Sequence, residues 1–188
     1  TRRGKHTAAV ILDIAKRKGA LKYGRFRLSA GGTSSYYFDG RLITLDPEGA
    51  VTIASVLLPI LWECKADALA GPTIGADPIV ATVAAMSFMK GRPIAGLIVR
   101  KEVKQYGDGR LIEGPLEAVR RVAVIDDTCT TGASLMHAIA AVETVACEVV
   151  KVICVLDRGG GGREEIKRRG YDFVALLEAN NTGEIRAM

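Results

Sequence analysis

The chain has 188 residues, of which 48% are hydrophobic and 25% are charged, a composition that excludes an intrinsically disordered protein. Its net charge of +5 favours anionic partners and leaves nucleic acid, acidic lipid and phosphorylated metabolites open. Four cysteines without a CxxC pair, with only two histidines, argue against a zinc site and a disulfide scaffold. Because no run of about 20 apolar residues occurs, we predict no membrane span. We expect one domain over residues 1–188, with reduced thiols, in the cytoplasm.

The first third of the chain predicts two helices with a pair of strands between them. Apolar residues recur at helical spacing over 8–15, and a glycine follows as a natural stop. Aromatic residues mixed with glycine and serine over 23–38 predict short strands and a turn. Asp46 as N-cap and Pro47 at the first helical position predict a second helix. Pro59 falls inside its apolar pattern and predicts a kink or an early end.

Short apolar runs alternate with helical patterns from residue 66 onward. The predicted strands cover residues 66–70, 94–99, 122–125, 149–156 and 173–177, and the predicted helices cover residues 79–89, 133–145 and 163–169. This alternation predicts an α/β fold with a mostly parallel central sheet flanked by helices. Ligands of such folds bind at the carboxyl ends of the strands, so function is expected in the loops there.

The most informative segment is 121–134, which consists of an apolar strand, two acids, a hydroxyl-rich turn and a helix. A helix N-terminus offers unpaired N–H groups and partial positive charge, and Gly132 allows close approach of the backbone, so the turn suits a phosphate monoester. Asp126 and Asp127 would repel a phosphate, and ribose hydroxyls on the same ligand are the groups from which they could accept hydrogen bonds. Either aspartate alone would more simply cap the turn. The whole segment favours a sugar phosphate.

This segment resembles the motif that binds phosphoribosyl pyrophosphate (PRPP) in type I phosphoribosyltransferases. The resemblance implies a single-domain type I phosphoribosyltransferase fold in which the aspartates hold the ribose hydroxyls and the turn wraps the 5′-phosphate. It also implies that Mg²⁺ is held mainly through PRPP, with no metal site made by the protein. The residues that it assigns to PRPP are Asp126, Asp127, Thr128, Cys129, Thr130, Thr131, Gly132, Ala133 and Ser134, with Asp127 also catalytic.

The segment 100–114 has three cations within five residues, followed by glycines, and resembles the mobile loop of the orotate phosphoribosyltransferases. Positioned cations stabilise the charge that develops on a departing pyrophosphate. A solvated basic loop is the alternative interpretation. The resemblance implies a loop over about 101–115 that reaches the neighbouring subunit, and therefore a homodimer with shared active sites. It assigns Arg100, Lys101, Lys104 and Tyr106 to PRPP, with Lys104 as the main catalytic lysine and Tyr106 where many members have histidine.

Three further segments extend the resemblance to the orotate enzymes. Residues of about 20–40 resemble the N-terminal hood of the family, with Ser29 in place of a lysine that contacts PRPP in many members. Residues 71–77 resemble the pyrophosphate loop, where some members have a lysine near Gly75. The residues that the resemblance assigns to orotate are Thr130, Arg158 and Phe38, of which the arginine could fork onto a carboxylate or carbonyl edge. In isolation, a turn-rich surface β region also fits the composition of the first segment, and a plain strand-to-helix turn fits residues 71–77 equally well. A surface pair of Asp157 with Arg158 is the commoner interpretation of an isolated Asp-Arg, but less so at the mouth of the proposed site.

Together these resemblances imply transfer of the 5-phosphoribosyl group from PRPP to orotate, giving orotidine 5′-phosphate and pyrophosphate in pyrimidine (UMP) biosynthesis. We expect PRPP and orotate as partners, and neither nucleic acid nor membrane. A phosphoribosyltransferase for purine bases would keep the segment at 121–134 but would not need the cationic loop or Arg158. A regulator that binds nucleic acid is permitted by the pI of about 9.1, although no basic patch with interleaved aromatic residues marks such a surface.

Overall fold

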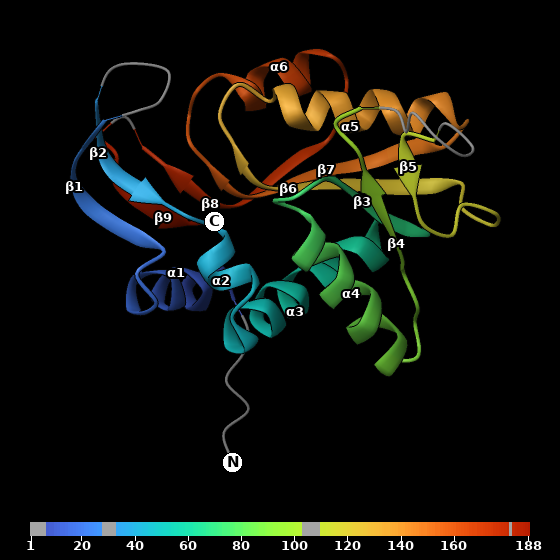
Figure 1. Cartoon of the computed structure of the whole chain (residues 1–188), viewed down its shortest axis with the longest axis horizontal. Helices are drawn as coiled ribbons and strands as arrows, with labels where there is room; N and C mark the ends of the chain where they lie inside the picture. The colour runs from blue at the N-terminus through green and yellow to red at the C-terminus, as the bar shows by residue number, and fades with distance from the viewer. Residues whose placement is uncertain (1–6, 28–32, 103–109, 181) are drawn as a thin grey trace.

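The computed structural model describes residues 7–27, 33–102, 110–180 and 182–188, and within them the strands form two sheets (Figure 1). A small antiparallel sheet pairs β1 (Leu21–Arg27) with β2 (Thr33–Phe38). The larger sheet has the order β5-β4-β3-β6-β7-β8-β9. Its strands are β3 (Ala68–Pro72), β4 (Ala95–Val99), β5 (Ile112–Glu113), β6 (Arg121–Cys129), β7 (Glu148–Asp157), β8 (Phe173–Ala179) and β9 (Ile185–Ala187).

The strands β4, β3, β6, β7 and β8 are parallel, and β5 and β9 pair antiparallel at the two edges. The helices are α1 (Ala8–Arg17), α2 (Arg41–Thr44), α3 (Pro47–Glu63), α4 (Asp77–Met89), α5 (Ala133–Thr144) and α6 (Gly162–Arg168). Figure 1 shows α1, α3 and α4 on one face of the sheet and α5 and α6 on the other. The prediction of a mostly parallel sheet between helical layers is therefore confirmed.

Each face of the sheet buries its own apolar core. On one face Ile11 and Leu57 of the helices pack with Ile125 of β6. On the other face Leu135 and Ile139 of α5 pack with neighbouring strand residues. Strands covered on both faces read as continuous apolar runs, which is why these strands could be located in the sequence.

The start of α3 follows the predicted capping pattern, whereas its end does not. The Asp46 carboxylate accepts hydrogen bonds from the N–H groups of Glu48 and Gly49, each at 3.1 Å, and Pro47 takes the first helical position. Of the two outcomes predicted at Pro59, a kink or an early end, the early end is wrong, because α3 continues to Glu63. Pro59 is exposed, so its ring lies away from the buried face of the helix.

Several boundaries differ from the predicted ones. β6 continues past residue 125 through both aspartates to Cys129, and β3 ends at Pro72, two residues beyond the predicted end at residue 70. The short elements α2, β5 and β9 have between two and four residues, too few to show a periodicity, and were not predicted. No helix among the described residues has the length and apolar character needed to cross a bilayer.

The residues of about 20–40, for which a hood is predicted, fold as the small antiparallel sheet, although Ser29 lies outside the described residues. This sheet is tied to the end of the large sheet, beside β9 in Figure 1. The Tyr23 hydroxyl accepts the N–H of Ile185 at 3.2 Å, and the Ser35 hydroxyl donates to the Thr182 carbonyl at 3.2 Å. These contacts tie the small sheet to β9 and to the turn before it.

Candidate active site

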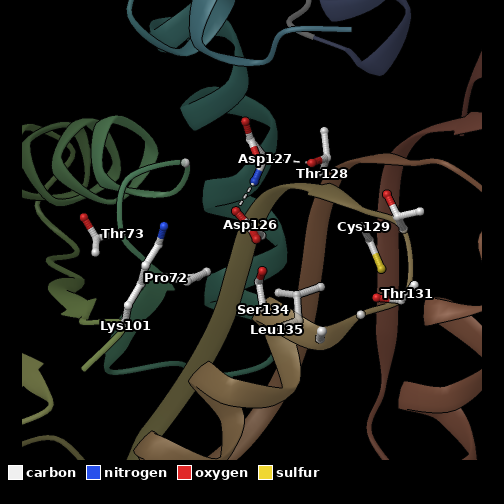
Figure 2. A pocket seen from close by; sticks show the side chains of 14 residues that line it. Pro72, Thr73, Lys101, Asp126, Asp127, Thr128, Cys129, Thr131, Ser134 and Leu135 are labelled. Atoms are coloured by element: carbon white, nitrogen blue, oxygen red, sulfur yellow. Dashed lines mark hydrogen bonds between the residues drawn. The ribbon is translucent and has the colours of Figure 1, made fainter. Parts of the chain in front are cut away.

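A cavity of about 310 Å³ opens where β3 and β6 end and α5 begins (Figure 2). All residues from Asp126 to Ser134 line it, together with Pro72, Thr73, Gly75, Lys101 and Leu135. The structure thus brings the segment predicted to hold PRPP into one pocket with the loop after β3 and with Lys101 of the cationic segment. This is the carboxyl edge of the parallel strands, the expected place for a ligand.

The turn from Cys129 to Gly132 presents the N-terminus of α5 to this cavity. Gly132 adopts a φ of +80° and precedes the first helical residue, and no side chain caps the helix there. Its N–H groups and partial positive charge therefore face a pocket whose rim carries the exposed hydroxyl residues Thr130, Thr131 and Ser134. The arrangement is suited to a phosphate group.

The two aspartates lie beside this turn, and their carboxylates repel each other electrostatically. Asp126 is 7% exposed, and the N–H of Asp127 donates to Oδ1 of Asp126 at 2.9 Å. Burial, and then the negative charge of Asp127, raise the pKa of Asp126 to about 8. Asp127 is half-buried, and Figure 2 shows its carboxylate pointing away from the turn. Near neutral pH the pair therefore holds a proton that a ligand with hydroxyl donors could displace.

Two glycines from distant segments make room for Asp127. A Cβ atom on Gly40 would lie 2.7 Å from Asp127 Oδ2, and a Cβ atom on Gly75 would lie 2.9 Å from Oδ1 of both Asp126 and Asp127. Such distances are shorter than carbon and oxygen tolerate, so any side chain at either position would displace a carboxylate. Gly40 is the N-cap residue of α2, and Gly75 belongs to the loop after β3.

A second cavity, of about 270 Å³, adjoins the first on the side of the hood. The end of β2 and the start of α2 line one side of it, and the loop after β3 lines another. Gly75, Asp127 and Thr128 line both cavities. A ligand that filled both would therefore pass directly over Asp127.

Arg158 does not line the second cavity itself but is hydrogen-bonded to Phe38, which does. Its Nη2 donates to the Phe38 carbonyl at 2.9 Å, and its guanidinium carbon lies 5.9 Å from the centre of the Tyr36 ring. Within the described residues its buried Nε has no hydrogen-bond partner. Phe38 lines the second cavity, although it is only 4% exposed and belongs to the apolar core.

The other residues predicted for substrate contacts differ in their placement. Lys101 lines the first cavity opposite the acid pair, with Thr73 beside it (Figure 2). Arg100 does not line it, and its Nη1 pairs with Glu113 at 3.4 Å. Lys104 and Tyr106 lie outside the described residues. Thr130, assigned to both ligands, lines the first cavity and not the second.

Two contacts near the cavities were missed from the sequence. His137 Nε2 lies 2.8 Å from the Arg100 carbonyl, so the protonated nitrogen of the ring donates to the residue just before Lys101. Asp157 is 2% exposed and accepts hydrogen bonds from Gly159 and Arg163 next to the turn. His137 gives no signal in the sequence, because a single exposed histidine on a helix is ordinary. In the sequence, Asp157 stands out only as the neighbour of Arg158, in a pair that is typical of the protein surface.

The chain is similar to known proteins in both sequence and fold. No protein-family model matches the chain. An orotate phosphoribosyltransferase of Aquifex aeolicus (strain VF5) is 42% identical over 153 residues, which cover 81% of this chain and 84% of the relative. The orotate phosphoribosyltransferase of Mycobacterium tuberculosis H37Rv, solved with Fe(III) dicitrate, superposes with a TM-score of 0.80 at 34% identity, covering 94% of this chain and 99% of that one. The same M. tuberculosis enzyme in complex with PRPP gives a TM-score of 0.74 at 32% identity, covering 91% and 95%.

Proposed function

The chain belongs to the orotate phosphoribosyltransferase family, and from this premise we propose that the two adjoining cavities are its active site. There the enzyme transfers the 5-phosphoribosyl group of PRPP to orotate, with orotidine 5′-phosphate and pyrophosphate as products of this step in pyrimidine biosynthesis. One observation carries the assignment of the site: a phosphate-binding turn, an acid pair and a second cavity meet at Asp127.

PRPP lies along the first cavity in this proposal. The turn from Cys129 to Ser134 takes the 5′-phosphate on main-chain N–H groups and hydroxyls. Asp126 and Asp127 accept hydrogen bonds from the ribose hydroxyls. The diphosphate extends toward Thr73 and Lys101, which line the opposite wall. The M. tuberculosis relative that was solved with PRPP supports a PRPP site in this family.

Orotate occupies the second cavity, against the hood. A planar ring there would lie between the segment ending β2 and the loop at Gly75, on the side of Asp127 away from the phosphate turn. Arg158 contributes a guanidinium whose bond to Phe38 uses one of its five N–H donors, so others can meet the orotate carboxylate or a carbonyl edge. Thr130 acts on the phosphate side in this arrangement.

The chemistry that the protein must provide is positioning and charge stabilisation. A ring nitrogen of orotate attacks the anomeric carbon as pyrophosphate leaves, and positive charge develops on the ribose while negative charge develops on the departing oxygens. The carboxylates of Asp126 and Asp127 lie on the ribose side and stabilise the positive charge. Lys101, with Lys104 and Arg100 of the same segment, stabilises the departing diphosphate.

Mg²⁺ is the cofactor that we propose, carried mainly on the oxygens of PRPP. Among the described residues, no group of three or more His, Cys, Asp or Glu side chains could hold a metal ion. The two adjacent carboxylates are oxygen donors of the kind that Mg²⁺ prefers, and a cation beside them would offset their repulsion of a diphosphate. When bound, Mg²⁺ neutralises part of the charge on the leaving group.

We propose further that the enzyme is a cytoplasmic homodimer with shared active sites. Free thiols at all four cysteines are typical of a reducing compartment. Ile74, 65% exposed, lines the second cavity, and Leu42 and Leu45, 48% and 69% exposed, follow Gly40 and Arg41 of its wall in the chain. These residues give apolar surface that a second copy could cover. In a shared site, Lys104 of one subunit would act with Asp127 of the other.

The reaction itself is tested by following orotate consumption spectroscopically with and without PRPP and Mg²⁺. Adenine, guanine and uracil serve as competing bases, and preferential use of a purine would overturn the proposal. Lys104→Ala is expected to lose most of the turnover, and activity within about a factor of two of wild type would remove Lys104 from the mechanism. Mixing Lys104→Ala with Asp127→Asn should restore activity in hybrid dimers, and verified hybrids without activity would argue against shared sites.

A further inference from the structure

The segment from Asp157 to Gly162, which joins β7 to α6, packs directly on the phosphate-binding turn. The Arg158 N–H donates to the Cys129 carbonyl at 2.8 Å, and the Gly162 N–H donates to the Thr130 carbonyl at 2.9 Å. A Cβ atom on Gly160 would lie 2.8 Å from the Thr130 carbonyl oxygen, and one on Gly162 would lie 2.6 Å from the main-chain nitrogen of Gly132. The two segments are therefore in main-chain contact, and neither can shift without moving the other.

A largely buried ion pair joins the two ends of this segment: the side chain of Asp157 is 3% exposed and that of Arg163 is 21% exposed. The Asp157 carboxylate accepts the Gly159 N–H on its Oδ1 at 2.9 Å. Its Oδ2 accepts Nε of Arg163 at 2.7 Å, and Arg163 Nη2 pairs with Glu178 of β8 at 3.0 Å. Asp157 begins the segment and Arg163 follows it, so the pair joins its two ends. Neither residue lines either cavity.

We propose that Asp157 and Arg163 are positioning residues, whose ion pair braces the segment 157–163 and so fixes the phosphate-binding turn and Arg158 together. The inference rests on the proposed function, in which the turn holds the 5′-phosphate and Arg158 meets orotate. Through Arg158 the brace also reaches the hood, because that guanidinium donates to the Phe38 carbonyl. One buried pair would thus set the relative position of both substrates.

A role in stability alone makes a different prediction from a role in positioning. Removing one partner of a buried ion pair leaves an uncompensated charge and destabilises any fold. A stability role would therefore lower the melting temperature and leave the kinetic constants of the folded enzyme unchanged. A positioning role would raise KM for PRPP and for orotate together, because the turn and Arg158 move as one unit.

The test compares Arg163→Met and Arg163→Lys with a substitution of a control arginine, Arg121, which begins β6 at the end of the strand away from the cavities. Arg121 pairs with Glu148 at 2.7 Å and donates to the carbonyls of Cys64 and Lys65, so Arg121→Met removes a comparable set of contacts away from the site. Melting temperature, kcat and both KM values are measured below the unfolding transition of every variant. Asp157→Asn, which keeps an oxygen for the Gly159 N–H, is the milder variant if Arg163→Met does not fold.

We expect Arg163→Met, or Asp157→Asn in its place, to raise both KM values by about tenfold. Arg163→Lys should recover most of this loss, and Arg121→Met should change the melting temperature with KM values close to wild type. Folded brace variants with both KM values within about twofold of wild type would overturn the brace alone. Failure of the wild-type protein to convert orotate would overturn the proposed function, and the brace with it.

Discussion

We expect the affinity for PRPP to depend on pH through Asp126. Burial, and then the charge of Asp127, raise its pKa to about 8, against roughly 3.9 for an ordinary aspartate. At pH 7 only about one tenth of the free enzyme then has Asp126 ionised. If the ionised carboxylate accepts the ribose hydroxyls, PRPP binding expels this proton, and affinity rises by up to about tenfold per pH unit until the pH passes 8.

The raised pKa of Asp126 makes the free energy of unfolding fall with rising pH, whereas the affinity for PRPP rises. The folded protein holds the proton on Asp126 more tightly than the unfolded chain does, because its pKa is raised by folding. This contribution to the free energy of unfolding is complete below the unfolded pKa and is lost as the pH rises toward about 8. Binding of PRPP should therefore tighten over the range in which the free protein loses this part of its stability.

Isothermal titration calorimetry with PRPP and excess Mg²⁺, from about pH 6.5 to 8.5, measures this linkage. Asp126→Asn is the matched control, since it cannot ionise at this position and still reports the titration of PRPP itself. Two buffers with different ionisation enthalpies count the released protons. Wild type should release more protons than Asp126→Asn near pH 7 and show the steeper rise in affinity. Equal slopes for the two proteins would refute the reasoning.

Three further changes test separate parts of the site. Gly75→Ala should raise KM for PRPP about tenfold with little loss of stability, because the new Cβ displaces the carboxylates of the acid pair; steady-state kinetics and a thermal melt check this. Arg158→Ala should raise KM for orotate about tenfold while the calorimetric Kd for PRPP stays within about twofold, a split that a general folding defect would not produce. His137→Ala should lower kcat/KM for PRPP by about threefold to tenfold and His137→Gln should restore it, since the glutamine amide can also donate to the Arg100 carbonyl; equal losses in both variants would contradict this role.

The parts of the fold that could be predicted from the sequence are those with long local patterns. The buried parallel strands read as apolar runs, and α3 begins where Asp46 and Pro47 predict it. The end of β6 was missed, because Asp126 and Asp127 look like loop residues although the strand continues through them to Cys129. Their backbone pairs with β7, with Asp126 opposite Cys154, and only the neighbouring strand reveals this.

In the candidate site too, local features could be predicted from the sequence, whereas contacts between distant segments could not. The segment from Cys129 to Ser134 is continuous in the sequence, so strand, turn and helix signals stand next to one another. The cavity-lining turn could therefore be singled out as a candidate phosphate site. The contacts around Asp127 come from segments far apart in sequence. Gly40 and Gly75 are ordinary turn glycines until the fold places each within side-chain distance of that carboxylate.

The role of the four glycines over 159–162 also becomes clear only from the structure. In the sequence they indicate only a flexible connection. In the structure Gly160 and Gly162 have no room for a Cβ atom, because the segment presses against the main chain of the phosphate-binding turn. Absence of side chains here permits close packing, and the buried pair of Asp157 with Arg163 supplies the rigidity that glycine cannot. A glycine run next to a buried ion pair is thus compatible with an ordered support for a binding site, provided that a second segment occupies the space that side chains would have filled.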